Sequence, residues 1–286
     1  MGAVITLRAM TAADIPLGMR LKEAAGWNQT AADWQMMLAC PGGAFVAAVD
    51  GVDAGTTTVV SYGDRFSWVG MVLVDPACRR RGVGTALLHA AIDYAAPLGP
   101  VRLDATPLGK QLYDTLGFRD EYTLARMERQ AVRQAAPVQG EAGEVQPLAA
   151  DRLSAVIAYD APVFGAPRPA ILVALAANRP EYAYLQLTDE RVTGYCLGRA
   201  GSRFDQIGPI VADDEAGARS VLLAALGHSR GSAVIVDALA GHTGWMEFLH
   251  SLGFVEQRPF IRMCLGELRH PGEPARQYAI AGPEIG

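Results

Sequence analysis

Residues 67–96 read SWVGMVLVDPACRRRGVGTALLHAAIDYAA, and they are the most informative part of the 286-residue chain. The segment from Ser67 to Asp75 is a β-type run that ends in an Asp-Pro turn, and the segment from Thr85 to Ala96 carries apolar residues at helical spacing. An arginine- and glycine-rich loop therefore separates a strand from the start of a helix. Backbone N–H groups at a helix start are unpaired, and the helix dipole favours negative charge there. The segment predicts an anion cradle suited to a pyrophosphate.

The glycine pattern of this loop differs from two common phosphate loops. The chain has no G-x-x-x-x-G-K-[ST], and Leu87 stands where a dinucleotide-binding fingerprint needs its third glycine. The loop instead shows R-x-x-G-x-G, formed by Arg79, Gly82 and Gly84 after a strand that ends in Val-Asp-Pro. An ordinary tight turn with solvated arginines stays open as the alternative.

An internal repeat links the two halves of the chain. Residues 112–127 read LYDTLGFRDEYTLARM and residues 248–263 read FLHSLGFVEQRPFIRM, so both contain L-G-F followed, eight residues after the Phe, by R-M. Upstream, Leu103-Asp104-Ala105 is echoed by Val236-Asp237-Ala238. Shared segments in the same order predict two domains of one fold.

On this basis we expect a first domain at 1–129, a linker at 130–147, a second domain at 148–270 and a tail at 271–286. The linker is assigned because its residues include Gly, Pro, Gln and Glu without an apolar period. In the tail, Tyr278 and Ile280 are apolar side chains that a disordered segment would tend to lack. We therefore expect both to pack onto the folded body.

The R-x-x-G-x-G loop and the later segment L-Y-x-x-L-G-F at residues 112–118 together resemble the GNAT acetyltransferase superfamily. The resemblance spans most of residues 3–128 and extends to bacterial tandem-GNAT proteins, which have a catalytic first half and a degenerate second half. It implies an α/β (α+β) fold with two tandem GNAT-like domains. Each domain would be a mixed, mostly antiparallel sheet flanked by helices.

The resemblance also implies acetyl-CoA as co-substrate, with its pyrophosphate on the loop and its pantetheine arm along the preceding strand. The residues implied for this binding are Val72, Leu73, Val74, Arg79, Arg80, Arg81, Gly82, Val83, Gly84 and Thr85. In the second half, Gly82 and Gly84 fall opposite about Ser220 and Leu222. We therefore expect the second half to lack the phosphate loop and the chain to bind one acetyl-CoA.

Tyr113 is the catalytic candidate that the resemblance implies. In GNAT enzymes the tyrosine of this motif often protonates the CoA thiolate, because a thiolate leaves more readily when it is protonated or hydrogen-bonded. A core tyrosine whose hydroxyl meets a backbone carbonyl is the alternative. The repeat places Leu249 opposite Tyr113, which indicates that the second half lacks this acid.

No general base can be identified on the strand before the loop, because residues 68–74 contain no carboxylate. Many GNAT enzymes carry a glutamate there. Asp104, at the end of the next strand, is the nearest candidate, and it could equally cap a turn or position a water. A relayed water, or an amine partly neutral at working pH, would serve instead.

Acceptor contacts are expected ahead of the phosphate loop. Trp27 and Asn28 would supply an apolar wall and an amide, although Trp27 could equally be an ordinary core aromatic. Thr30 can cap the following helix, with Asp33 in its first turn.

Composition restricts the other function classes. With 50% hydrophobic and 19% charged residues the chain reads as soluble and globular, and no apolar run approaches the roughly 20 residues of a membrane span. The N-terminus has no signal-peptide pattern, so we expect a cytoplasmic protein. The net charge of −5 argues against a nucleic-acid partner. The cysteines and histidines have no metal-ligand spacing, so no metal is expected.

We therefore expect an acetyl-CoA-dependent N-acetyltransferase that moves an acetyl group directly to a primary amine of a small molecule or peptide, with no nucleic-acid or membrane partner. A homodimer is compatible with this interpretation. The second domain would serve in substrate selection, dimerisation or regulation. The alternative is an acyl-CoA-binding regulatory or sensor protein without turnover.

Overall fold

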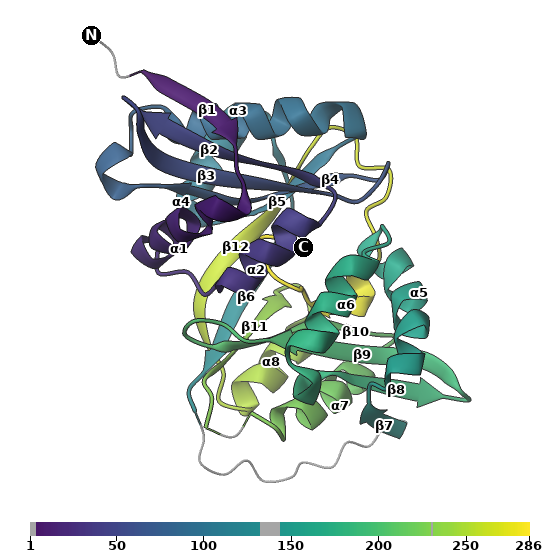
Figure 1. Cartoon of the computed structure of the whole chain (residues 1–286). Helices are drawn as coiled ribbons and strands as arrows, with labels where there is room; N and C mark the ends of the chain where they lie inside the picture. The colour runs from purple at the N-terminus through teal and green to yellow at the C-terminus, as the bar shows by residue number, and fades with distance from the viewer. Residues whose placement is uncertain (1–3, 132–143, 230) are drawn as a thin grey trace. The chain divides into compact units, whose positions relative to one another are not determined.

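The computed structural model describes residues 4–131, 144–229 and 231–286, which form two compact units. Unit 1 comprises Met1–Asp120, Met263–Arg269 and Glu284–Gly286. Unit 2 comprises Glu121–Arg262 and His270–Pro283. Figure 1 colours the chain by residue number, so that the late, yellow segments can be followed.

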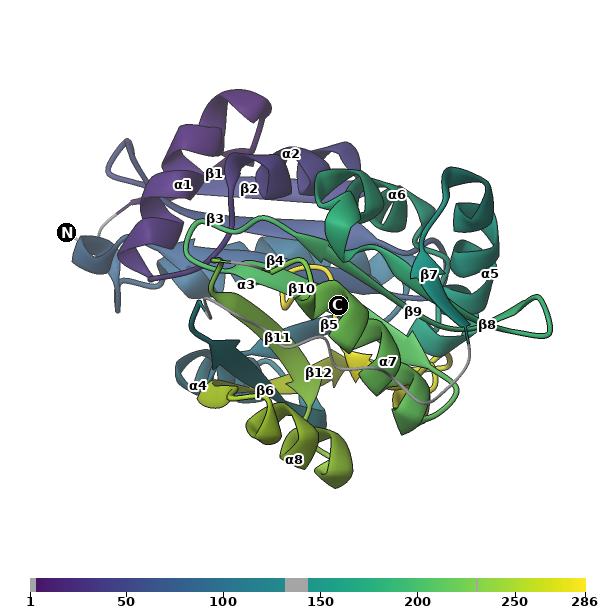
Figure 2. The same ribbon diagram turned by 90° about the horizontal axis from the view of Figure 1, so that it is seen from below.

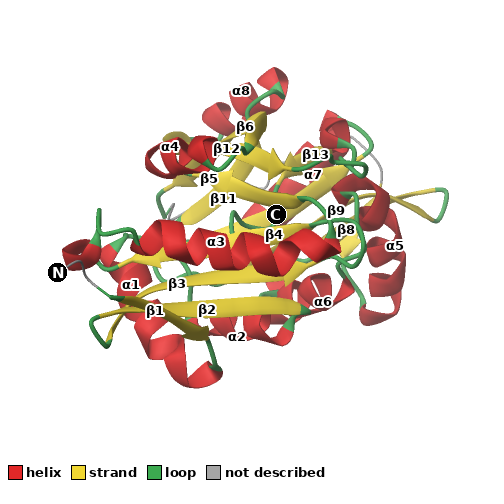
Figure 3. Ribbon diagram, turned by 90° about the horizontal axis from the view of Figure 1, so that it is seen from above, coloured by secondary structure: helices red, strands yellow, loops and turns green. Residues whose placement is uncertain are grey.

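Unit 1 alternates strands and helices. Its elements are β1 (Ile5–Ala9), α1 (Ile15–Ala24), α2 (Ala31–Ala39), β2 (Gly42–Val49), β3 (Val52–Ser61), β4 (Ser67–Val74), α3 (Val83–Ala95), β5 (Val101–Ala105) and α4 (Pro107–Thr115). The strand order is β1-β2-β3-β4-β5, antiparallel up to β4 and parallel between β4 and β5. Helix α3 covers one face of this sheet, and α1 and α2 cover the other (Figures 1 and 3).

Helix α3 forms because its apolar positions recur at helical spacing. Leu87, Leu88, Ala91 and Ala95 are all fully buried, and Leu87 packs with Val83 on residues of β2 and β3. The helix begins at Val83, two residues before the predicted start at Thr85. The strand predicted at Ser67–Asp75 is β4, and it ends one residue earlier.

Unit 2 repeats this plan. Its elements are β6 (Arg119–Arg129), β7 (Glu144–Pro147), α5 (Leu153–Phe164), α6 (Pro169–Asn178), β8 (Tyr184–Thr188), β9 (Arg191–Arg199), β10 (Asp205–Ala212), α7 (Glu215–Leu226), β11 (Val234–Leu239), α8 (Thr243–Ser251), β12 (Val255–Leu265) and β13 (Gln277–Ala279). The strand order is β12-β6-β11-β13-β10-β9-β8-β7. Helices α5 and α6 cover one face, and α7 and α8 cover the other (Figure 2).

The expected fold class is confirmed, because each unit is a mixed, mostly antiparallel sheet flanked by helices. The expected boundaries differ from the compact units. Almost all of β6 belongs to unit 2, where it pairs antiparallel with β11 from Leu124↔Leu239 to Arg129↔Val234. Residues 263–269, which include the end of β12, belong to unit 1. The repeat predicts the order of the elements along the chain. It does not predict to which unit β6 and the end of β12 belong, because that depends on backbone pairing.

The expected linker at 130–147 is also shorter than predicted. Residues 144–147 form β7, which pairs antiparallel with β8 from Glu144↔Leu187 to Pro147↔Tyr184. Residues 132–143 lie outside the described part of the chain. Within the described ranges, no helix is both long and apolar enough to cross a membrane.

The repeated L-G-F motif ends a helix in both units. Gly117 follows α4 with φ +88° and Gly253 follows α8 with φ +83°, a conformation that glycine adopts without strain. The N–H of Phe118 donates to the C=O of Tyr113 at 3.2 Å, and the N–H of Phe254 donates to the C=O of Leu249 at 3.1 Å. This is the Schellman arrangement, in which the residue after the glycine packs back on the helix.

The C-terminal tail is part of the folded body. Tyr278 and Ile280, predicted to pack, are 4% and 0% exposed. Ile280 lies among Leu124, Leu239 and Phe260, and its N–H donates to the C=O of Asp237 at 3.0 Å.

Replacing Ile280 with Ala should therefore lower the unfolding free energy of unit 2 by about 2–5 kcal/mol, the usual cost of such a cavity. Scanning calorimetry measures the shift in melting temperature. Leu108→Ala is the control, because Leu108 is 81% exposed and its truncation leaves no cavity. An unchanged melting temperature for Ile280→Ala would show that the tail does not stabilise the fold.

Candidate active site

The site begins where two parallel strands separate. Among the described residues, β4 and β5 pair at Ser67↔Val101 and Trp68↔Arg102 only, although β4 continues to Val74. Beyond Trp68, the backbone of β4 is therefore no longer paired with β5. Backbone groups on such an edge need another partner, which an extended ligand lying along the strand can supply.

A β-bulge helps to turn β4 at this point. The register with β3 shifts between Thr56↔Leu73 and Thr58↔Gly70, and Met71 has φ +51°. The hydroxyls of Thr56 and Thr57 donate to the C=O groups of Met71 and Gly70, at 3.1 and 3.2 Å. These bonds hold the bulge in place.

The loop after β4 is held by Asp75. Its carboxylate accepts the N–H of Ala77 at 3.0 Å and a hydrogen bond from the guanidinium of Arg20. These contacts, the one with Arg20 foremost, lower the pKa of Asp75. The Asp-Pro turn predicted from sequence therefore rests on an ionised side chain.

Helix α3 begins directly behind this loop. Gly82 is its N-cap with φ +85°, and the first helical bond runs from the N–H of Ala86 to the C=O of Gly82 at 2.9 Å. The N–H groups of Val83, Gly84 and Thr85 therefore precede any acceptor within the helix. A Cβ built on Gly82 meets a single neighbour, Ile5 Cδ1 at 3.6 Å, so it would project into the space that an anion needs.

The remaining predicted binding residues surround this helix start. Arg79, Arg80 and Arg81 are exposed, and Arg81 donates to Asp50 Oδ2 at 3.1 Å. Val72, Leu73 and Val74 lie on β4 beyond the last pair with β5. The ten residues expected to bind acetyl-CoA therefore lie together on the end of β4, the following loop and the start of α3, and their role in binding stays a prediction.

In unit 2 two parallel strands also separate after two paired positions, but another strand lies in the gap between them. Strands β10 and β11 pair in parallel at Asp205↔Val234 and Gln206↔Ile235, and β13 then lies between them in the strand order. Strand β13 pairs antiparallel with both neighbours, for example at Ile210↔Ala279 and Ala238↔Ala279. A strand of the chain therefore occupies this gap in unit 2, whereas no strand lies between β4 and β5 in the part of unit 1 that the structure describes.

The helix start of unit 2 is also unsuited to an anion. Helix α7 begins after Asp214, whose carboxylate caps the helix by accepting the N–H of Gly217 at 2.8 Å. A carboxylate at this place repels a pyrophosphate. The expected correspondence of Gly82 and Gly84 with about Ser220 and Leu222 was wrong in position, because both residues lie in the middle of α7.

Tyr113 lies on α4, half-buried, with its ring 5.8 Å from that of Phe118. This ring contact belongs to the helix-ending motif, and the corresponding Leu249 is fully buried in unit 2. The helix-ending motif accounts for an apolar ring at this position but not for a hydroxyl group. The Tyr113 hydroxyl has no hydrogen-bond partner within the described residues. Burial raises the pKa of Tyr113 to about 12, so the hydroxyl is protonated at neutral pH.

Asp104 lies half-buried on β5. Two residues later, the hydroxyl of Thr106 caps α4 by accepting the N–H of Gly109 at 3.2 Å. In unit 2 the corresponding Asp237 is fully buried and accepts two bonds from Arg126, at 2.7 and 2.8 Å. That repeat partner has a structural role, and a catalytic role for Asp104 stays a prediction.

The acceptor candidates lie between α1 and α2. Trp27 is half-buried and Asn28 is 5% exposed. The predicted cap is present, since the N–H and hydroxyl of Thr30 both donate to Asp33 Oδ2, at 2.6 and 2.9 Å. The next residue, Gln29, is 4% exposed and was not singled out from the sequence.

The structure adds a carboxylate that sequence reasoning missed. Glu284 of the tail belongs to unit 1, is 2% exposed and accepts a hydrogen bond from Gln29 Nε2 at 3.0 Å. Its backbone lies against Gly70 of β4, where an added Cβ would stand 2.6 Å from the Glu284 carbonyl oxygen. Its position near the end of the chain gave no sequence signal for this place.

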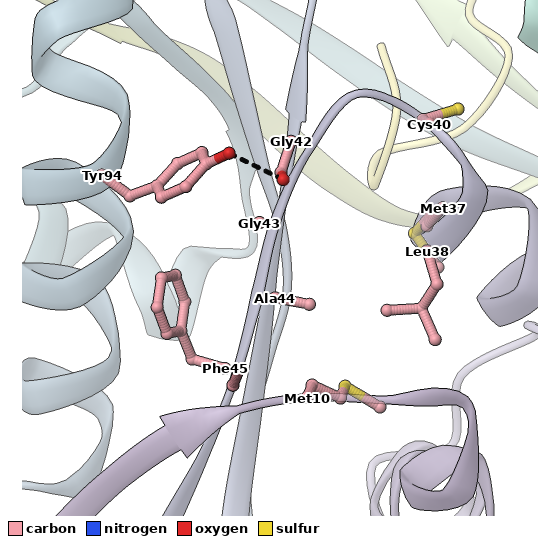
Figure 4. A pocket seen from close by; sticks show the side chains of 10 residues that line it. Met10, Met37, Leu38, Cys40, Gly42, Gly43, Ala44, Phe45 and Tyr94 are labelled. Carbon is pink, nitrogen blue, oxygen red and sulfur yellow. Dashed lines mark hydrogen bonds between the residues drawn. The ribbon is translucent and has the colours of Figure 1, made fainter.

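A cavity of about 290 Å³ lies elsewhere in unit 1, around the first residues of β2. Tyr94 and Phe45 lie on one side of the strand, and Met37 and Leu38 lie on the other (Figure 4). The hydroxyl of Tyr94 donates to the C=O of Gly42 at 2.7 Å. None of the predicted site residues lines this cavity. In the described part of the chain, no group of three His, Cys, Asp or Glu side chains could hold a metal ion.

Comparisons with known proteins agree with this geometry. A family model described as the acetyltransferase (GNAT) family matches residues 16–118, and one described as an acetyltransferase (GNAT) domain matches residues 156–279. Holothin acyltransferase of Pseudoalteromonas sp. (strain SANK 73390) is 26% identical over 245 residues, which covers 85% of this chain and 81% of that protein.

Two further proteins are similar over most of their length. The uncharacterized N-acetyltransferase YitH of Bacillus subtilis (strain 168) is 24% identical over 224 residues, 78% of this chain and 77% of that protein. The crystal structure of a putative acetyltransferase from Pyrococcus horikoshii superposes with a TM-score of 0.80 at 23% identity, covering 99% of this chain and 96% of that one. Because a GNAT model matches each half, the chain belongs to the GNAT acetyltransferase family and carries two GNAT domains in tandem.

Proposed function

We propose that the protein is an acetyl-CoA-dependent N-acetyltransferase with a single active site, in unit 1. The observation that carries the proposal is the contrast between the two strand divergences. Among the described residues of unit 1, no strand lies between β4 and β5 and a glycine caps the start of α3, whereas β13 and Asp214 occupy the equivalent places in unit 2. Family membership supports acyl transfer in general, and the relative named an N-acetyltransferase supports a nitrogen acceptor.

In this mechanism acetyl-CoA binds with its pyrophosphate at the N–H groups of Val83–Thr85 and its pantetheine arm beside Val72–Val74. A primary amine then attacks the thioester carbonyl directly. Backbone N–H groups of β4 near Leu73 stabilise the oxyanion, a contribution that grows as charge develops in the transition state. Binding both substrates on one rigid sheet supplies the proximity that the reaction needs.

Tyr113 assists the departing sulfur. A thiol has a pKa of about 8.5, well below the value of about 12 for Tyr113. The phenol is therefore a poor donor of a whole proton to a thiolate, and its contribution is a hydrogen bond that stabilises the leaving group. This refines the role expected from the family resemblance.

The first test is the number of acetyl-CoA molecules bound. Calorimetry should give one per chain, because the gap in unit 2 is filled by β13. Gly82→Val should abolish binding, since its side chain would occupy the phosphate space. Gly63→Val is the matched control, because Gly63 also has positive φ (+65°) and has no neighbour within 4 Å of an added Cβ. Two equivalent sites, or equal loss in both variants, would contradict the assignment.

A second test addresses turnover. Tyr113→Phe should keep acetyl-CoA affinity and lower turnover by about 10- to 1000-fold, because the departing sulfur loses its hydrogen-bond donor. The measurement is release of free CoA thiol across a panel of primary amines. Tyr94→Phe is the control, because the Tyr94 hydroxyl bonds the C=O of Gly42 outside the site. Turnover like wild type would leave Tyr113 as a helix-ending aromatic only. Binding without thiol release by the wild-type protein would favour the sensor.

A further inference from the structure

The site described so far lacks a base on the strand where the family commonly has one. Residues 68–74 of β4 contain no carboxylate, so a protonated amine has no acceptor there for its proton. An ammonium cannot attack a thioester until it has lost a proton, because its nitrogen lone pair is occupied. The mechanism therefore needs a proton acceptor from another element.

Glu284 supplies a carboxylate at this strand. Its carbonyl oxygen and Cα would stand 2.6 and 2.9 Å from a Cβ on Gly70, so the tail lies directly on the residue before the bulge at Met71. The residues after the bulge, Val72–Val74, are those expected to contact the pantetheine arm. Glu284 thus lies at the end of the β4 edge where the thioester would be placed.

The tail is held firmly in this position. Ile285 is fully buried, and its C=O accepts a hydrogen bond from the hydroxyl of Tyr62, which is itself 4% exposed. Gly70 makes the close approach feasible, because any side chain there would collide with the Glu284 backbone. The carboxylate is therefore carried by a fixed segment of unit 1.

Gln29 adds a second acceptor beside this carboxylate. Its Nε2 donates to Glu284 Oε2 at 3.0 Å, which fixes the orientation of the amide. Its Oε1 is buried and has no hydrogen-bond partner among the described residues. A buried carbonyl oxygen without a donor is costly, and the N–H of a bound amine would satisfy it.

We propose that Glu284 is the general base for the acceptor amine and that Gln29 positions that amine, which makes primary ammonium compounds the substrate class. This proposal rests on the proposed function of unit 1. The ammonium donates hydrogen bonds to the Glu284 carboxylate and to Gln29 Oε1. Glu284 then takes one proton, and the neutral nitrogen is left with its lone pair facing the thioester.

The reaction balances as R–NH3⁺ plus acetyl-S-CoA giving R–NH–acetyl, CoA–SH and H⁺. The N–C bond forms and the C–S bond breaks, with the bonding pair leaving on sulfur. The nitrogen loses two protons. One goes first to Glu284 and from there to solvent, and the other ends on the CoA thiol.

The experiment compares two small amines with wild type and Glu284→Gln. n-Propylamine is a cation at pH 7 and needs a base, whereas hydroxylamine is already neutral. The substitution keeps the side-chain size and an oxygen that can accept from Gln29 Nε2. We expect it to lower CoA thiol release with n-propylamine by about 10²- to 10⁴-fold and to leave release with hydroxylamine and acetyl-CoA affinity unchanged.

Glu273→Gln is the matched control, because Glu273 is a tail carboxylate that bonds Arg276 at 2.7 Å and is 45% exposed. It should change neither rate. Melting temperatures of all variants check folding, and Glu284→Asp should restore part of the n-propylamine rate if Glu284→Gln is destabilised.

The outcomes separate this proposal from the proposed function. Wild-type transfer to hydroxylamine but not to n-propylamine would overturn the role of Glu284 and leave the acetyltransferase standing. Equal losses with both amines would also overturn it, since they would indicate a structural role. No transfer to either amine, with acetyl-CoA bound, would overturn the proposed function as well.

Discussion

The separation of two parallel strands after two paired positions is the constraint on which both units depend. A strand that leaves its ladder exposes N–H and C=O groups that must find other partners. In unit 1 this edge follows Trp68 on β4, and in unit 2 it follows Gln206 on β10. Unit 2 satisfies its edge with β13 of the same chain, so the two repeats have one backbone plan and different uses for it.

The C-terminal tail contributes residues to both units, beside the diverging strand of each. It supplies β13 (Gln277–Ala279) to unit 2, and after residues 280–283 it supplies Glu284–Gly286 to unit 1. In each unit the tail backbone lies on a glycine of the diverging strand. An added Cβ on Gly208 would stand 2.1 Å from the carbonyl oxygen of Ile280, and one on Gly70 would stand 2.6 Å from that of Glu284. Both glycines are required because nothing larger leaves room for the tail.

The parts that sequence reasoning predicted are those governed by local rules. The strand, loop and helix around Gly82, the cap at Thr30 and the helix end at Gly117 all follow from residue types at short spacing. Tyr113 was singled out through the resemblance to the GNAT superfamily, and the repeat, which places Leu249 opposite it, separates the role of its ring from that of its hydroxyl. The position assigned to the lost loop of unit 2 was wrong, because counting along the chain cannot detect that β10 runs almost directly into α7.

From its residue order alone, the chain specifies a twofold repeat, the helix starts and ends, and the loop with unpaired N–H groups, because each depends on neighbours a few residues apart. Folding in three dimensions decides the partners that lie far apart. Pairing of β6 with β11, insertion of β13 beside β10, and the contact of Gln29 with Glu284 join residues that are 66 to 255 positions apart. Such contacts depend on which exposed edges and buried polar groups remain to be satisfied once the sheets have formed, and no local pattern encodes that.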